Sequence, residues 1–210
     1  MKSVGLLGGS FNPAHAGHRY ISIAALRRLG LDEVWWLVSP LNPLKDAADM
    51  APLAARIAAA KAIARQPRIR VTGIEARLGT RFAVDTVAAL VRRHPHVRFV
   101  WLMGADNLAQ FHRWSRWRSL ARRVPIAVLA RPGYMGQALI SPAMAWLGRW
   151  RHASAVARHW REWRLPAIVV LDIRLSPISA TAIRAADPDW ARRLFTDDKP
   201  EPTSLIRTTT

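Results

Sequence analysis

The sequence predicts an α/β protein built on a doubly wound parallel β-sheet with helices on both faces. Short β-rich segments alternate with longer helical segments along most of the 210-residue chain, which is typical of βαβ units. The short segments are almost continuously apolar, as strands are when helices cover both faces of a sheet. A chain of this length can form one domain with a sizeable core, and 50% of its residues are hydrophobic.

The expected strands and helices follow one another in a regular order. Strands are expected at VGLLG (4–8), EVWWLVSP (33–40), RIRVTGI (68–74), RFVWLMGAD (98–106), PIAVLARPG (125–133) and PAIVVLDI (166–173). Crossover helices are expected at residues 18–30, 52–65 and 83–94. Gly30 suits the C-terminal end of the first helix, and Pro52 suits the first turn of the second. Ligands bind such sheets at the C-terminal ends of the strands, where the strand order reverses, so the loops after the strands are the candidate functional positions.

Residues 134–165 interrupt this alternation. Their aromatic and alanine residues, spaced four, three, four and three apart, predict one face of an amphipathic helix over 144–163. These residues are Trp146, Trp150, Ala153, Ala157 and Trp160. We therefore expect a single domain over residues 1–195 with a Trp- and Arg-rich helical insertion at about 134–165. The tail, 196–210, is rich in Pro and Thr and is expected to be flexible.

The chain is strongly basic. Lys and Arg total 32 against 14 acidic residues, giving a formal net charge of +18. Such a balance favours anionic partners such as nucleic acids, phospholipid surfaces or phosphorylated metabolites. The excess is concentrated between Arg113 and Arg164, where eleven arginines accompany a single acidic residue, Glu162.

Composition also excludes several classes of protein. The chain has no cysteine, so disulfide frameworks, thiolate metal sites and thiol catalysis are excluded. No segment approaches the length of an uncharged membrane span, and the N-terminus does not resemble a signal peptide. A cytoplasmic protein with no membrane partner is expected.

The first candidate functional segment is GGSFNPAHAGH, residues 8–18. Gly8 and Gly9 would allow a tight turn and a close approach of backbone N–H groups to a phosphate. Gly17 and His18 would open a helix, whose N-terminus favours anions. The spacing of His15 and His18 leaves three interpretations open: phosphate donors, metal ligands or solvated residues at the start of a helix.

This segment resembles the GG-x-F-N-P-x-H-x-GH signature of the nucleotidyltransferase superfamily, particularly of bacterial nicotinate-nucleotide adenylyltransferases. Further segments match that family in order: SPLNPLK (39–45), DTVAAL (85–90), GADNLAQFHRWSRW (104–117) and SPISATAIRAA (176–186). The match extends over about residues 1–186 and implies a Rossmann-like nucleotidyltransferase domain. The chain departs from the family at Ala180, where a Ser is usual, and in lacking the family's closing V-x-x-Y-I segment.

The resemblance implies a role for each matching residue. It assigns catalytic phosphate contacts to His15, His18, Lys45 and Arg184. It assigns ATP binding to Gly8, Gly9, Ser10, Phe11, Gly17, Gly104, Asp106, Ile178, Ser179 and Thr181. It assigns nicotinate mononucleotide binding to Asn12, Asn42, Thr86, Trp114 and Arg131.

Several of these residues have an alternative interpretation from the sequence itself. Lys45 suits a solvated loop, and Thr86 suits a helix N-cap. Trp114 and Trp117 are spaced as a pair in a hydrophobic core would be. Asp106 has a chemical reason for its assignment, because a carboxylate accepts two hydrogen bonds from the vicinal hydroxyls of a ribose.

The implied reaction is adenylyl transfer from ATP to nicotinate mononucleotide, giving deamido-NAD and pyrophosphate in NAD biosynthesis. Mg²⁺ carried with ATP is the expected cofactor, with no metal site formed by the protein itself. The expected partners are the two small-molecule substrates and no nucleic acid, and a homo-oligomer is left open. Three alternatives remain: another HxGH adenylyl- or cytidylyltransferase, with nicotinamide mononucleotide or pantetheine phosphate among the acceptors, a nucleic-acid-binding protein that uses the Arg- and Trp-rich segment, or a basic membrane-surface module.

Overall fold

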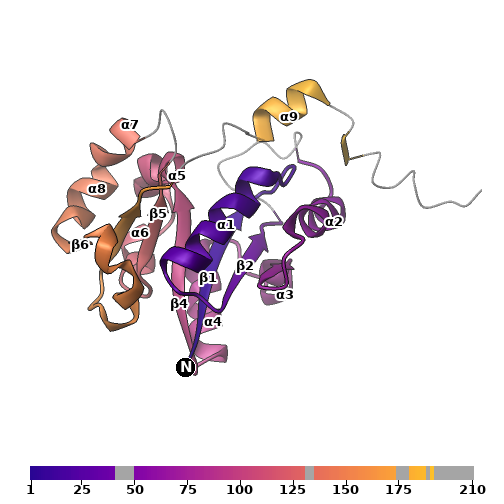
Figure 1. Cartoon of the computed structure of the whole chain (residues 1–210). Helices are drawn as coiled ribbons and strands as arrows, with labels where there is room; N and C mark the ends of the chain where they lie inside the picture. Colours follow the sequence, from indigo (N-terminus) through magenta and orange to yellow (C-terminus); the bar gives the residue numbers. More distant parts are fainter. Residues whose placement is uncertain (41–49, 131–134, 174–179, 188–189, 192–210) are drawn as a thin grey trace, which may run out of the picture.

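A computed structural model describes residues 1–40, 50–130, 135–173, 180–187 and 190–191. Its strands are β1 (Lys2–Gly9), β2 (Glu33–Val38), β3 (Ile69–Thr72), β4 (Val97–Gly104), β5 (Ile126–Leu129), β6 (Arg151–His152) and β7 (Ile168–Leu171). They form one sheet of order β3-β2-β1-β4-β5-β7-β6 (Figure 1). Every neighbouring pair is parallel, which confirms the predicted doubly wound sheet.

The helices lie between the strands and at the C-terminal end of the described chain. The α-helices are α1 (Ala16–Arg28), α2 (Leu53–Ala64), α3 (Ile74–Leu78), α4 (Ala83–Arg93), α5 (Ala105–Gln110), α6 (Trp117–Ala121), α7 (Met135–Leu139), α8 (Pro142–Leu147) and α9 (Ala180–Ala186). The 3₁₀ helices are η1 (Phe111–Arg113), η2 (Gly148–Trp150) and η3 (Ser154–Glu162). Gly30 has a φ of 60° just beyond α1, which confirms it as the stop of that helix. No helix within the described ranges is long and apolar enough to cross a membrane.

Helices bury both faces of the sheet, as the apolar strands require. One core cluster joins the sheet to α1, α2 and η3, and the other joins it to α4, α5, α6 and α8. Strand β1 feeds both clusters, because Leu6 belongs to one and its neighbour Leu7 to the other. Strand β1 is therefore covered on both faces, and only its ends can contact a ligand.

The strand order reverses at β1, which pairs with β2 on one side and with β4 on the other. The C-terminal ends of β1 and β4 thus flank the crevice where open parallel sheets bind ligands. The predicted segments 8–18 and 104–117 begin at these two ends, so the topology brings them together.

The amphipathic helix predicted over 144–163 is wrong. The chain instead forms the end of α8, η2, the short strand β6 and η3. Strand β6 pairs in parallel with β7, so the sheet satisfies its backbone groups in place of the hydrogen bonds of a helix. The His152 ring also stacks on Trp163, with ring centroids 3.9 Å apart. Ala157 and Trp160 are buried as the helical spacing predicted, whereas Ala153 is exposed.

Side chains of η3 attach the Trp- and Arg-rich region to the end of α1. Trp160 donates its indole N–H to the Leu29 carbonyl at 3.0 Å. Arg161 and Arg158 donate to the carbonyls of Gly30 at 2.8 Å and Arg27 at 3.1 Å. The last carbonyls of a helix lack partners within the helix and carry partial negative charge, so cationic donors stabilise them. The predicted flexible tail, 196–210, lies outside the described residues.

Candidate functional site

His15 and His18 form the N-terminal cap of α1. The His15 Nδ1 accepts a hydrogen bond from the Gly17 N–H, and the His18 Nδ1 accepts one from the His15 N–H, both at 3.2 Å. A nitrogen that accepts a hydrogen bond carries no proton, and a doubly protonated imidazole has no acceptor. The cap therefore places the ring proton of each histidine on Nε2, which makes both rings N–H donors through that atom.

Aromatic packing fixes the position of these rings. Phe11 lies 5.1 Å from Trp36 in a stacked arrangement and 4.8 Å from His18, and the two histidine rings are 3.9 Å apart. Phe11 has a φ of 47°, an uncommon value for a bulky residue, which its burial among these rings sustains. Ser22 adds a hydrogen-bonded link, because its hydroxyl accepts from Trp36 and donates to the His18 carbonyl, both at 2.8 Å.

The expected glycine turn differs from the observed one. Gly8 and Gly9 are the last residues of β1, and the residue in the left-handed region is Phe11. Gly8 is required by packing, because a Cβ there would lie 2.7 Å from the buried indole of Trp101. Gly8 therefore lets the neighbouring strand β4 place a tryptophan against the end of β1.

Asp106 occupies the first turn of α5, at the end of β4. Its carboxylate folds back against Gly104, where an added Cβ would collide with the Asp106 Oδ1. A glycine at position 104 is thus a condition for this side-chain position. Asp106 lies where the strand order reverses, on the opposite side of the crevice from the α1 N-terminus.

Arg184, which is far from β1 in the sequence, contacts the loop that follows β1 (the β1 loop). Its guanidinium donates to the Asn12 carbonyl at 2.6 Å, which joins α9 to the segment that carries the two histidines. Figure 1 shows α9 beyond the carboxyl ends of β1 and β2. The buried Asn12 side chain accepts from the Ala51 N–H at 3.2 Å, so the β1 loop is tied on its other side to the start of α2.

Thr86 is more buried than a ligand-contact role implies, whereas Trp114 keeps part of its surface exposed. Thr86 is fully buried in the first turns of α4, where its hydroxyl bonds to Thr80 at 2.8 Å and Glu75 at 3.1 Å. The N-cap of that helix is Phe82, so the N-cap interpretation of Thr86 is wrong. Trp114 is half-buried and packs edge-on against neighbouring rings, while Trp117 belongs to the core.

Some predicted site residues lie outside the described residues: Asn42, Lys45, Arg131, Ile178 and Ser179. Thr181 lies in the first turn of α9, and Gly17 lies in the first turn of α1. Hydrogen bonds thus join the residues after β1, the start of α1 and α9, and the sheet topology places Asp106 of α5 at the end of the neighbouring strand β4.

Two buried charged residues beneath the site were missed by sequence reasoning: Arg56 on α2 and Glu75 on α3. Burial lowers the pKa of the Arg56 guanidinium from its usual value. Burial raises the pKa of the Glu75 carboxyl, partly offset by hydrogen bonds from Thr86 and Ser39. A signal for Arg56 was present in the sequence, because it is the one charged residue on the buried, alanine-rich face of α2.

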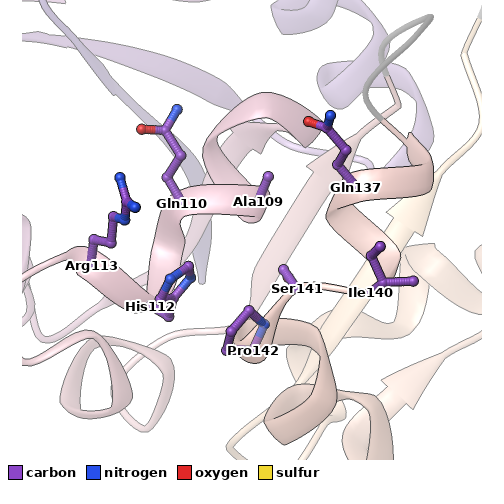
Figure 2. Close-up of a pocket in the computed structure, with 8 residues that line it drawn as sticks. All are labelled: Ala109, Gln110, His112, Arg113, Gln137, Ile140, Ser141 and Pro142. Carbon is purple, nitrogen blue, oxygen red and sulfur yellow. The ribbon is translucent and has the colours of Figure 1, made fainter.

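A pocket of about 370 Å³ lies at the other end of α5 from Asp106 (Figure 2). Gln110, His112 and Arg113 line it from α5 and η1, and Gln137 and Ile140 line it from the side of α7. None of the described site residues lines this pocket, so it is separate from the crevice at the strand-order reversal. Among the described residues, no three His, Asp or Glu side chains gather in a way that could hold a metal ion.

The chain is similar in sequence to proteins of one family. The model of the cytidylyltransferase-like family matches residues 6–186. A protein of Erythrobacter litoralis named a probable nicotinate-nucleotide adenylyltransferase is 60% identical over 189 residues, covering 90% of this chain and 86% of the relative. A protein of Cereibacter sphaeroides with the same name is 57% identical over 182 residues, covering 87% of this chain and 96% of the relative.

Solved structures show the same fold at much lower sequence identity. The Plasmodium falciparum nicotinic acid mononucleotide adenylyltransferase in complex with NaAD superposes with a TM-score of 0.67 at 16% identity, covering 88% of this chain and 83% of that one. The same enzyme in complex with APC gives a TM-score of 0.65 at 15% identity.

Proposed function

Because the chain belongs to the cytidylyltransferase-like family, and within it to the nicotinate-nucleotide adenylyltransferases, we propose that it transfers the adenylyl group of ATP to nicotinate mononucleotide. A phosphate oxygen of the mononucleotide forms a bond to the α-phosphorus of ATP. The bond from that phosphorus to the oxygen bridging to the β-phosphate breaks, which releases pyrophosphate and leaves deamido-NAD. The attacking phosphate is already an anion, so the reaction needs no general base.

The observation that carries this proposal is the histidine cap at the strand-order reversal. The cap assigns the ring proton of both His15 and His18 to Nε2, so each ring is a hydrogen-bond donor there. Donors held in place by packing are suited to charge that builds on a transferring phosphoryl group, because they need no reorganisation during the reaction. A metal-binding role for these histidines has no comparable support, since neither ring has a cluster of further ligands among the described residues.

The remaining site residues divide between the two substrates. Arg184, on α9 beside the β1 loop, and Lys45 would neutralise phosphate charge. Asp106 would accept hydrogen bonds from the ribose hydroxyls of ATP, alongside Gly104. The acceptor would lie toward Asn12, Asn42, Thr86, Trp114 and Arg131. Since the Thr86 hydroxyl is used within the protein, we propose that this residue acts by holding the start of α4 rather than by contacting the substrate.

Mg²⁺ would enter with ATP. The phosphates would supply most of its ligands, because the described residues offer no cluster of carboxylates and histidines to hold the ion alone. When bound, the ion would neutralise charge on the transferred group and on the leaving pyrophosphate.

The test is a panel of acceptors supplied to the purified full chain with ATP and Mg²⁺. Pyrophosphate release would be measured with nicotinate mononucleotide, nicotinamide mononucleotide and pantetheine phosphate, and the dinucleotide product identified by mass. We expect the highest kcat/KM with nicotinate mononucleotide. An equal or higher value with the nicotinamide compound would contradict the acceptor assignment, and no pyrophosphate with any acceptor would contradict adenylyl transfer.

A further inference from the structure

We propose that Arg56 and Glu75 are positioning residues for the mononucleotide acceptor: buried beneath the site, they hold together the segments after β1 and β2 and the start of α4. The inference rests on the proposed function and deepens it, because it concerns one of the two substrates. Neither side chain need touch the substrate, and both act through the backbone and hydroxyl groups that they bind.

Arg56 is almost completely buried and is surrounded by backbone carbonyls. Its guanidinium donates to Ser10 at 2.7 Å, Ser39 at 2.7 Å, Pro40 at 3.1 Å and Ala51 at 2.8 Å. These carbonyls come from three places in the sequence: the loop after β1, the segment after β2 and the residues before α2. A planar guanidinium has five N–H donors in a fixed fork, which no other side chain can supply.

The carbonyls of Pro40 and Ala51 have a particular position in the sequence. They stand on either side of the stretch that contains Asn42 and Lys45, two of the predicted substrate contacts. Arg56 thus fixes the chain before and after that stretch, and it binds Ser10 in the same loop as the histidines. Ala51 is also the residue whose N–H binds the Asn12 side chain.

Glu75 joins the same region to α4. Its carboxyl is buried and accepts from the Thr86 hydroxyl at 3.1 Å, and the Ser39 side chain also hydrogen-bonds to it. Ser39 is therefore shared by the two buried groups, because its carbonyl binds Arg56 and its side chain binds Glu75. The Ser39 N–H completes the link by donating to the Gly9 carbonyl at the end of β1 at 3.0 Å.

This network is connected to more of the predicted acceptor contacts than of the ATP contacts, of which it binds Gly9 and Ser10 through their backbone carbonyls. Three predicted acceptor contacts are attached to it or flanked by it: Asn12, Asn42 and Thr86. By contrast, the proposed ribose contact Asp106 is set by Gly104 and by the end of β4. Buried charged groups are costly to desolvate, and their removal leaves the bound carbonyls without partners, so a role in holding loops at a defined spacing accounts for their presence.

The experiment compares Arg56→Lys, Glu75→Leu and Glu75→Gln with the wild type. Dissociation constants for nicotinate mononucleotide and for a non-hydrolysable ATP analogue would be measured separately, together with both KM values. Arg56→Lys keeps the charge but lacks the planar set of guanidinium N–H donors. Glu75→Leu loses the hydrogen bonds to both Thr86 and Ser39. We expect each to weaken mononucleotide binding about 10- to 100-fold, as misplaced binding groups do, with the nucleotide constants changed less than about 3-fold.

Conservative and distant variants provide the controls. Glu75→Gln keeps an acceptor oxygen of similar size for Thr86 and should restore mononucleotide binding to near the wild-type value. Ser141→Ala removes a buried helix cap in α8, so it should lower stability without separating the two substrates. Thermal unfolding of each variant would confirm that it is folded under the assay conditions.

The outcomes separate the inference from the function on which it rests. An active wild type whose Arg56→Lys and Glu75→Leu variants bind both substrates normally, or lose both in parallel, would overturn the positioning role alone. The same selective loss in Ser141→Ala would also overturn it, because the effect would then follow from stability. A wild type without adenylyl transfer to the mononucleotide would overturn the proposed function first.

Discussion

Arginine serves two different purposes in two regions of this molecule. Beneath the site, Arg56 is 1% exposed and binds carbonyls of three loop segments. Within residues 113–164, the arginines that the structure describes are exposed and several lie over indole rings, with Arg118 4.5 Å from Trp117 and Arg122 5.2 Å from Trp146. A buried guanidinium fixes backbone geometry, whereas an exposed one covers an aromatic surface while staying hydrated.

The difference predicts where substitutions act. The region around Arg56 is held by hydrogen bonds to loops that carry site residues, so its changes should alter substrate binding. The Arg- and Trp-rich region is held by ring packing and by contacts to the end of α1, away from the histidines at the start of that helix. Its changes should alter stability and leave catalysis by the folded protein nearly intact.

The largest expected effect follows from Trp160→Ala. Trp160 is 1% exposed and donates to the Leu29 carbonyl, so its removal creates a cavity and leaves that carbonyl without its donor. We expect a loss of about 3–5 kcal/mol in the free energy of unfolding, measured by denaturant titration. The kcat/KM of the folded fraction should stay within about 2-fold of the wild type. A fall in kcat/KM larger than the fall in the folded fraction would contradict the proposal that this region affects stability and not catalysis.

A second effect concerns the pH dependence of stability. Burial raises the pKa of Glu75 above its ordinary value of 4.5 in the folded state. Below that value the carboxyl is protonated in both states, and as the pH rises above it the unfolded state loses its proton first. Glu75 therefore makes the folded protein progressively less stable relative to the unfolded chain until the pH passes the folded-state pKa.

The measurement is the unfolding free energy of the wild type and of Glu75→Gln across this pH interval. The wild type should lose stability relative to the variant as the pH rises. Asp32 and Glu33, whose pKa values are lowered in the folded state, are present in both proteins, so their contribution cancels in the difference. A difference that is independent of pH would show that the Glu75 carboxyl ionises as readily in the folded protein as in the unfolded chain.

The smallest expected effect is that of Arg118→Gln. Arg118 lies over both Trp117 and Trp146, and its side chain is exposed to solvent. We expect a loss of about 0.5–1 kcal/mol in unfolding free energy, typical of an exposed cation–π contact. Arg123→Gln is the matched control, because Arg123 is exposed nearby and lies over no ring of the described residues. Equal losses in the two variants would assign the effect to net charge.

The sequence was most informative where one physical cause dominated. The strands were predictable because burial on both faces makes them continuously apolar, and Gly30 was predictable because a helix ends readily on a residue that tolerates positive φ. Segment 8–18 was predictable as a functional loop because its motif follows the first strand. The histidine cap itself, with the tautomers it selects, required the structure.

The sequence was least informative where distant contacts decide the outcome. The helical spacing over 144–163 did not reveal that β7 offers a strand edge at Arg151 and His152. The partners of Arg56 and Glu75 are mostly carbonyls and hydroxyls, which leave no pattern in the sequence, and the one signal for Arg56 was its place on the alanine-rich face of α2. Thr86 was assigned from its motif alone, and its burial depends on how α3 and α4 pack.

The measurement that tests the central claim most directly is the kinetics of His18→Ala. The claim is that the histidine pair donates hydrogen bonds to the transferring phosphoryl group. We predict a fall of about 10²–10³ in kcat with nicotinate mononucleotide, while the dissociation constant for the ATP analogue changes less than about 3-fold. Thermal unfolding would measure separately the cost of losing the cap of α1. Turnover close to the wild-type value in a folded His18→Ala protein would contradict the claim.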